Sequence, residues 1–328
     1  MKLRKKFITI AVAIFLGLLI ITCAKEPPPL RVGVTVWPGN EILYLAGNLG
    51  YYDNTPIQLL DYPSGSELIR AYRNRDLEVA TMTLDEVLSI AETATDMRIV
   101  LVRDISYGGD AILGKPEIKK LQDLKGRRVG VESTALGAFV LSRALEQVGL
   151  SPKDVKIVSL LASQHEQSFK QGSIEAVVTY EPTVSKLQAV GANLLFDSRQ
   201  IPNEIIDIVT MTESVVTKQS DAAQTLIDGW FRALDYLQRH PQDAARRIAP
   251  HAGVTPEQFL KSLNSIRIPD VQENKKILGK TDTPSLTAVR RIAKIMVEKD
   301  LLKKAVDPTS MFDARLVQDV EVSIFKTK

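Results

Sequence analysis

The sequence predicts an α/β protein of two lobes that exchange strands. Short apolar runs alternate with amphipathic, helix-like segments from residue 30 to about residue 212, which is typical of mostly parallel sheets covered by helices on both faces. The 328 residues are enough for two sizeable cores. The alternation contains no Pro-, Gly- or Ser-rich linker, so the pattern favours two lobes that share the chain over two independent domains.

The expected elements follow from periodicity and from helix-start signals. Ser64 with Glu67, and Thr83 with Glu86, fit the spacing of capping boxes at the start of two helices. Helices are expected over residues 41–49, 64–74, 83–93, 164–171 and 184–189, with a further helix that ends at Gly149. Strands are expected over residues 30–36, 57–60, 79–82, 98–103, 111–113, 128–131, 155–161, 176–179, 193–196 and 205–210.

The chain after Thr212 is expected to be mainly helical. Two apolar faces repeat there at helical spacing. One consists of Leu226, Trp230, Phe231, Leu234 and Leu237, and the other of Leu286, Val289, Ala293 and Met296.

The amino-terminal residues 1–22 have the pattern of a secretory signal peptide. A basic start precedes an apolar run over residues 7–21, which is shorter than the roughly 20 residues of a membrane span. The only cysteine, Cys23, follows this run as in the lipobox of bacterial lipoproteins, although Thr22 departs from the usual Gly or Ala. Lipidation of Cys23 is therefore expected, with residues 23–29 as a tether. The alternatives are an uncleaved anchor, or ordinary secretion with an incidental cysteine.

Charge and composition exclude several classes of protein. The net charge is +3, but residues 1–22 hold four basic groups and no acids, which leaves 38 basic and 39 acidic residues in the rest. The body has no basic domain or stripe, so a nucleic-acid binder is not expected. A single cysteine excludes an internal disulfide and a cysteine-based zinc site.

Motifs for nucleotide binding, metal binding or hydrolysis are incomplete. Residues 109–115 have the Walker A spacing, but Pro116 replaces the Ser or Thr that would hold magnesium. The three histidines, His165, His240 and His251, are far apart in sequence. We expect His165 and His240 on helix surfaces or ends, and we expect no metal, no cofactor and no catalytic group.

Three segments carry a resemblance to a known family. They are AYRNRDLEV at residues 71–79, LQDLKGRRVGVE at residues 121–132 and GSIEAVVTYEP at residues 172–182. The chain from residue 30 to residue 301 resembles the solute-binding proteins of bacterial ABC importers of the nitrate/sulfonate/taurine class. That class is similar to the pyrimidine-precursor binders of thiamin metabolism. Asp76 and Glu175 depart from the usual Gly and Asp of the pattern.

The resemblance implies a periplasmic-binding-protein fold of type II, with two crossover strands and a ligand cleft between the lobes. It implies residues 30–108 and 206–328 as lobe 1 and residues 109–205 as lobe 2. The expected protein is exported, periplasmic or at the cell surface, monomeric, and not an enzyme; its partners are a small-molecule ligand, an ABC permease, and the membrane through the lipid anchor. A ligand-sensing lipoprotein and a pyrimidine synthase of the same fold remain as alternatives.

Ligands of α/β sheets bind beyond the carboxyl ends of strands and at helix amino termini. That rule selects candidates at the ends of the expected strands. The alternative role of Ser64 and Thr83 is to act only as helix caps. The alternative position of Trp37 is in the core. The candidate ligand-binding residues are Trp37, Ser64, Thr83, Tyr107, Asp110, Glu132, Ser133, Tyr180 and Glu181.

The charges at these strand ends favour one kind of ligand. Asp110, Glu132 and Glu181 are acidic, Asp207 lies close to the second crossover, and Arg103 is the only nearby cation. An inorganic anion would favour Arg, Lys or bare helix amino termini. An aminopyrimidine, an amine or an aminosulfonate is therefore favoured over an inorganic anion.

Overall fold

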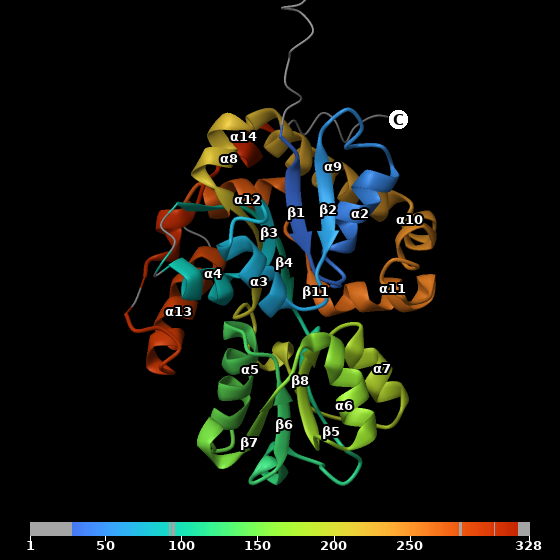
Figure 1. Ribbon diagram of the computed structural model, residues 1–328, viewed down its shortest axis with the longest axis vertical. Helices are drawn as coiled ribbons and strands as arrows, with labels where there is room; N and C mark the ends of the chain where they lie inside the picture. Colours follow the sequence, from blue (N-terminus) through green and yellow to red (C-terminus); the bar gives the residue numbers. More distant parts are fainter. Residues whose placement is uncertain (1–27, 92, 94–95, 282–283, 305, 321–328) are drawn as a thin grey trace, which may run out of the picture.

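A computed structural model of the chain describes residues 28–91, 93, 96–281, 284–304 and 306–320. It contains two mixed β-sheets, each covered by helices, and the two bodies are stacked along the long axis of the molecule (Figure 1). The prediction of a two-lobed α/β fold is confirmed. The predicted signal peptide, Cys23 and residues 24–27 of the predicted tether lie outside the described residues.

The first lobe is built on a six-stranded sheet with the order β11-β4-β10-β3-β1-β2. Strand β1 pairs in parallel with β2 and β3, whereas β10 runs antiparallel to β3 and β4. The strands are β1 (Leu30–Val34), β2 (Ile57–Asp61), β3 (Val79–Thr83), β4 (Met97–Ser106), β10 (Ile206–Thr212) and β11 (Ile266–Arg267). The helices that precede the second lobe in sequence are α2 (Glu41–Asn48), α3 (Gly65–Arg73) and α4 (Leu84–Ala91).

The second lobe is built on a five-stranded sheet with the order β7-β6-β8-β5-β9. Strand β6 pairs in parallel with β7 and β8, and β5 runs antiparallel to β8 and β9. The strands are β5 (Asp110–Gly114), β6 (Arg128–Val131), β7 (Lys156–Ser159), β8 (Ala176–Tyr180) and β9 (Asn193–Asp197). The helices are α5 (Ala135–Glu146), α6 (His165–Gln171) and α7 (Thr183–Ala189).

The chain passes between the lobes twice, from β4 to β5 and from β9 to β10. Both strands that begin a new sheet after a passage, β5 and β10, are antiparallel to their neighbours. The expectation of mostly parallel sheets is therefore wrong for these strands. Alternating strand and helix patterns do not reveal the direction in which the chain enters a new sheet.

The carboxyl-terminal part is helical, as expected, and packs on the first lobe. The two expected apolar faces are buried on the two long helices α9 and α13. The short strand β11 was not expected from the sequence. The helices are α8 (Glu213–Lys218), α9 (Ser220–Arg239), α10 (Pro241–Ile248), α11 (Pro256–Ser262), α12 (Val271–Leu278), α13 (Pro284–Glu298) and α14 (Arg315–Asp319). Among the described residues, no helix combines the length and apolar character that crossing a membrane requires.

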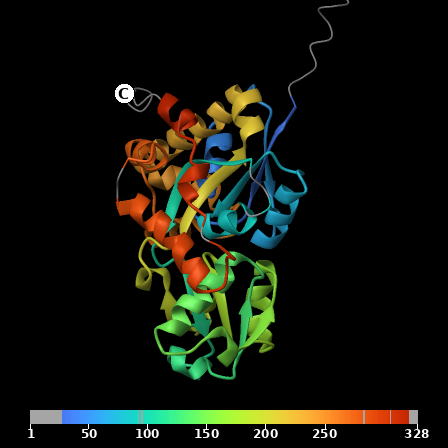
Figure 2. The same ribbon diagram turned by 90° about the vertical axis from the view of Figure 1, so that its left-hand side faces the viewer.

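Helix α13 also reaches the second lobe (Figure 2). Lys299, just after its end, lies 2.5 Å from Glu146 at the end of α5. Glu204, between β9 and β10, accepts hydrogen bonds from both Arg143 of α5 and Arg291 of α13. These charged contacts join the lobes on one side of the molecule.

A histidine joins two acidic residues on the first lobe. His251 Nδ1 lies 2.8 Å from Glu41 Oε2, Nε2 lies 3.2 Å from Asp61 Oδ1, and the ring stacks on Tyr44. The hydrogen bond to Glu41, supported by Asp61, raises the pKa of His251 to about 9. Protonated His251 is therefore part of the folded state at neutral pH.

We expect this histidine to make stability depend on pH. Because its pKa is raised by folding, its contribution is complete below the unfolded value of about 6.5 and is lost as the pH rises through about 9. His251→Gln should flatten the fall in urea midpoint between pH 6.5 and about 9.5, and His240→Gln should leave that fall in place. An identical pH slope in wild type and His251→Gln would contradict the expectation.

Candidate functional site

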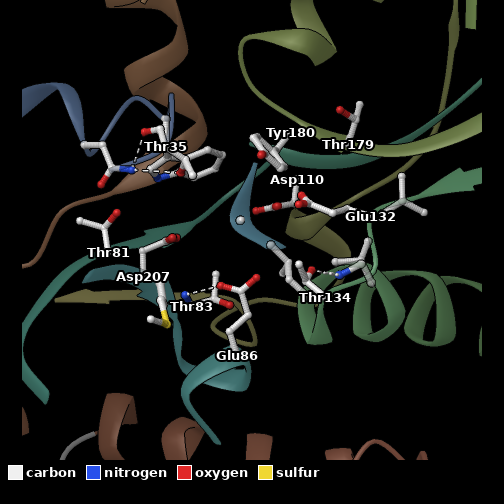
Figure 3. Close-up of a pocket in the computed structure, with 18 of the residues that line it drawn as sticks. Thr35, Thr81, Thr83, Glu86, Asp110, Glu132, Thr134, Thr179, Tyr180 and Asp207 are labelled. Carbon is white, nitrogen blue, oxygen red and sulfur yellow. Dashed lines mark hydrogen bonds between the residues drawn. The ribbon is translucent and has the colours of Figure 1, made fainter. Parts of the chain in front are cut away.

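A cavity lies between the two sheets and is lined by residues of both lobes (Figure 3). The first lobe contributes the turn after β1, the end of β3 and the start of α3. The second lobe contributes the start of β5, the segment after β6, the start of α6 and the end of β8. The lining residues are Thr35, Trp37, Asn40, Gly65, Thr81, Met82, Thr83, Glu86, Arg103, Asp110, Glu132, Thr134, Leu136, Gly137, Val140, His165, Val178, Thr179, Tyr180 and Asp207.

The antiparallel strands explain why these segments meet. Asp110 begins β5 and pairs directly with Tyr180, which ends β8. Asp207, near the start of β10, pairs with Thr83 at the end of β3. The start of an antiparallel strand thus reaches the edge at which its neighbour ends, and both kinds of end deliver polar side chains to the cavity.

Two aromatic side chains of the lining, one from each lobe, contact each other edge to face. Trp37 of the first lobe and Tyr180 of the second have ring centroids 6.1 Å apart and planes at 77°. The indole Nε1–H of Trp37 donates to Asp104 Oδ1 at 3.0 Å, which holds the ring in place. A Cβ atom at Gly109 would lie only 2.6 Å from this ring, so the glycine leaves room for the indole.

Arg103 is buried and bound to two carboxylates of its own lobe. Its Nε donates to Asp104 at 3.1 Å and its Nη2 donates to Asp207 at 3.0 Å. Burial and the neighbouring Asp104 raise the pKa of Asp207 well above its usual value, although the Arg103 charge opposes this. Two of the three guanidinium nitrogens are thus bound within the first lobe, whereas the buried Nη1 has no hydrogen-bond partner among the described residues.

Three further carboxylates line the cavity: Glu86, Asp110 and Glu132, each at most 6% exposed. Burial raises the pKa of Glu86 to about 8, and repulsion from Asp85 adds to this. Burial also raises the pKa of Asp110 to about 7 and shifts the pKa of Glu132 upward. These groups point into the same space from α4, β5 and the end of β6 (Figure 3).

Glu132 joins the two lobes. Its Oε1 accepts hydrogen bonds from the backbone N–H and the hydroxyl of Ser66, both at 2.8 Å. Ser66 lies in the first turn of α3, where backbone N–H groups have no partner within the helix. The carboxylate of one lobe therefore supplies an acceptor to the helix amino terminus of the other, and the cavity is closed by this contact.

We expect Ser66→Ala to loosen this closure. The substitution removes one of two hydrogen bonds to a charged acceptor, a contact worth about 1.5–3 kcal/mol, and leaves the backbone donor in place. The ligand-free variant should show a larger radius of gyration in X-ray scattering. Ser168→Ala on the outer helix α6 is the matched control, and an unchanged radius in Ser66→Ala would contradict the expectation.

His165 corrects one expectation from the sequence. It begins α6, but it is 1% exposed, lines the cavity, and has Nδ1 3.1 Å from Thr179 Oγ1. Burial lowers the pKa of this imidazole to about 4, so it is neutral at physiological pH. The sequence predicted a helix surface or end for His165. It does lie at a helix end, as the first residue of α6, but it is buried because that residue faces β8. The helix-start rule applied to the other candidates could have selected it.

The structure brings together five of the nine candidate residues: Trp37, Thr83, Asp110, Glu132 and Tyr180 line the cavity. The other four have different surroundings. Ser64 accepts from the Glu67 N–H as the cap of α3, and Tyr107 is 54% exposed. Ser133 Oγ lies 2.6 Å from Ser159 Oγ. Glu181 accepts hydrogen bonds from the N–H and hydroxyl of Ser185 in α7, and faces a second hollow beside Trp37.

Several lining residues were not selected from the sequence. Thr35, Glu86, His165 and Thr179 belong to this set, whereas Asn40 and Thr134 follow expected strands and fit the strand-end rule. Glu86 was noted only as a helix-capping partner, and its carboxylate does accept from the Thr83 N–H at 3.1 Å. Over the described part of the chain, no group of His, Cys, Asp and Glu has the arrangement of a metal site.

Comparisons with known proteins agree with this architecture. The taurine-binding periplasmic protein of Escherichia coli K12 is 24% identical over 181 residues, which are 55% of this chain and 51% of that protein. The chain thus matches about half the length of this relative. A Haemophilus influenzae protein named for thiamine biosynthesis is 24% identical over 293 residues, which are 86% of this chain and 90% of that protein.

Solved structures share the fold at low sequence identity. The alkanesulfonate-binding protein SsuA of Xanthomonas axonopodis pv. citri, bound to MOPS, aligns with a TM-score of 0.71 and 20% identity over 88% of this chain and 99% of its own. The desulfurization enzyme DSZB aligns with a TM-score of 0.65 and 17% identity over 90% and 99% of the two chains. At these identities the likeness concerns the fold alone.

The family is shown by a match over more than half of the chain. The sequence pattern of one family covers residues 23–252, which include both passages between the lobes and every segment that lines the cavity. The chain belongs to the NMT1-like family.

Proposed function

We propose that this protein is the extracytoplasmic solute-binding component of an ABC importer. It captures a small polar molecule between its lobes and delivers the molecule to a membrane permease. The observation that carries the proposal is the cavity itself, which takes polar and aromatic side chains from both lobes and is closed across them by Glu132 and Ser66. A site built from two lobes is completed only when they close, so closure reports the bound state to a partner.

The relatives support the same role. The Escherichia coli relative is named for binding taurine in the periplasm, and the Xanthomonas structure is of an alkanesulfonate-binding protein. We propose that the lobes comprise residues 30–108 with 206–328, and 109–205, and that the protein acts as a monomer. The proposed ligand is an aminopyrimidine, an amine or an aminosulfonate, because the lining carries more carboxylates than cations.

The proposed protein is a binder and not an enzyme. The fold also occurs in DSZB, an enzyme, so the fold by itself does not decide between the two. His165 at the cavity has its pKa lowered to about 4 by burial, far below the range near neutral pH that suits a general base. The only cysteine is Cys23, which precedes both proposed lobes.

Anchoring through a lipid on Cys23 is the proposed link to the membrane. The support is the single cysteine placed directly after a basic start and an apolar run. Cys23→Ser should appear in the soluble exported fraction, or retain its leader, when cell fractions are compared by immunoblotting. A processed, membrane-bound Cys23→Ser protein would contradict lipidation at this residue.

The binding role is tested by thermal-shift screening of the purified chain against aminopyrimidines, amines, aminosulfonates and inorganic anions. A ligand present at 100 times its dissociation constant adds about 2.7 kcal/mol of stability, which is a clear rise in midpoint. Vesicles that contain the permease should then retain the ligand-loaded protein better than the ligand-free protein. A protein that is stabilised by no compound of any class, and is not retained by the permease, would contradict the proposal.

A further inference from the structure

Three buried carboxylates of the cavity have no cationic partner. Glu86, Asp110 and Glu132 are 6%, 4% and 6% exposed, and none forms an ion pair with a Lys, Arg or His of the described chain. Glu86 and Glu132 come from different lobes but approach the same point. A Cβ atom built on Gly65 would lie 3.4 Å from Glu86 Oε1 and 3.8 Å from Glu132 Oε2.

The basic groups of the lining do not offset these carboxylates. Arg103 is bound to both Asp104 and Asp207 at 3.1 and 3.0 Å. His165 is neutral, because burial lowers its pKa to about 4. The lining therefore carries more acidic than basic groups, and the acidic groups come from both lobes.

A buried carboxylate without a cationic partner is costly, and proton uptake or a positive charge lowers that cost beyond what hydrogen bonds from Ser66 and Thr83 provide. Uptake of protons is consistent with the raised pKa values of Glu86 and Asp110, at about 8 and about 7. The rings of Trp37 and Tyr180 add surfaces that attract cations. The acidic groups, the aromatic surfaces and the closure from both lobes thus all favour a positively charged ligand.

We propose that the ligand held between the lobes is an organic cation that bears N–H donors, such as a protonated amine or amidine, and that Glu86, Asp110 and Glu132 select its charge. This inference rests on the proposed function and deepens it. The ligand's positive charge takes the place of the protons that the carboxyl groups hold without it. Anions, which the fold of the relatives accommodates, are excluded by the same three residues.

Proton displacement makes binding depend on pH. The groups that face the three carboxyls are Asp85 of α4, Asp104 and Arg103 of β4, Asp207 of β10, Glu67 of α3, His165 of α6 and Tyr180 of β8. His165 stays neutral between pH 6.5 and 8.5, because burial lowers its pKa to about 4. Affinity for a cation should rise over this interval as Glu86 and Asp110 ionise, and binding at pH 7 should release protons to the buffer.

The test uses matched probes of different charge. Benzamidine and agmatine are the cations, benzamide is the uncharged counterpart of benzamidine, and benzenesulfonate is the anion. Calorimetry on the purified full-length chain should show at least one cation binding tenfold more tightly than benzamide and benzenesulfonate. Its affinity should increase at least threefold from pH 6.5 to pH 8.5, with proton release measured in two buffers of different ionisation enthalpy.

Substitutions test whether the carboxylates select the charge of the ligand. Glu86→Gln and Glu132→Gln should each lower the ratio of cation to benzamide affinity at least fivefold; two variants are used in case one fails to fold. Glu175→Gln, which alters a carboxylate paired with Arg127 on the outside of the second lobe, is the control and should keep the ratio. Equal or tighter binding of benzamide or benzenesulfonate overturns the inference and leaves the solute-binding role intact. Failure of both cations to bind also overturns it, whereas the solute-binding role is judged by the wider screen.

Discussion

Arg103→Leu is expected to lower the free energy of unfolding by about 3–5 kcal/mol, the cost of removing one partner from a buried ion pair. The guanidinium is 1% exposed and donates to Asp104 and Asp207 at 3.1 and 3.0 Å. Burial and the Asp104 charge raise the pKa of Asp207 and Arg103 opposes that rise, so both carboxyl groups lose a cationic neighbour in the variant. Asp104 also holds the Trp37 indole, so the loss would reach the cavity. Urea unfolding of the ligand-free protein at pH 7 measures the effect.

The pH dependence of this loss identifies its cause. Arg103 opposes the rise in the pKa of Asp207, so without Arg103 that pKa should rise further, and the destabilisation should grow with pH and be smallest in acid. Arg75→Leu is the control, because Arg75 pairs with Asp96 at the surface with a side chain 70% exposed, and such pairs contribute about 1 kcal/mol or less. A loss for Arg103→Leu below about 1 kcal/mol, or one independent of pH, would contradict the assignment.

The fold was predictable because its signals are local. The helix α3 begins after Ser64, whose hydroxyl accepts from the Glu67 N–H, as the capping box predicted. The apolar faces of α9 and α13 are likewise buried as predicted from helical spacing. The directions of β5 and β10 were not predictable, because they depend on how the chain crosses between lobes and not on the residues within each strand.

The site was predictable only in part, since the strand-end rule places a residue but not its side chain. Asp110 and Glu132 point into the cavity, whereas Glu181, the residue after β8, turns to Ser185 of α7. The sequence did not predict Glu86 as a site residue, because its spacing from Thr83 already explained it as a helix-capping partner. In the structure its carboxylate accepts from the Thr83 N–H and also faces the second lobe. The contact between Glu132 and Ser66 joins residues 66 positions apart, and no local pattern reveals it.

Asp110 and Glu181 provide a matched pair for the ligand site. Both are buried carboxylates at the same edge of the second sheet, at 4% and 7% exposed, and the sequence placed both in the site. Only Asp110 lines the cavity between the lobes; Glu181 accepts from the Ser185 hydroxyl at 2.8 Å. Asp110→Asn and Glu181→Gln therefore each replace a similarly buried carboxyl group by an amide, the first inside the cavity and the second outside it.

Asp110→Asn should weaken ligand binding about ten- to a hundredfold, because a hydrogen bond to a charged group is worth about 1.5–3 kcal/mol and each 1.4 kcal/mol is about tenfold in affinity. The fold should be retained or stabilised at pH 8, since burial raises the pKa of Asp110 to about 7 and the amide carries no charge to bury. Calorimetric titration with the ligand found by screening measures the affinity, and thermal unfolding measures the stability. Glu181→Gln should bind within about threefold of wild type. Equal affinity in wild type and Asp110→Asn would remove this carboxylate from the site, and a large loss in Glu181→Gln alone would move the site to the hollow beside Trp37.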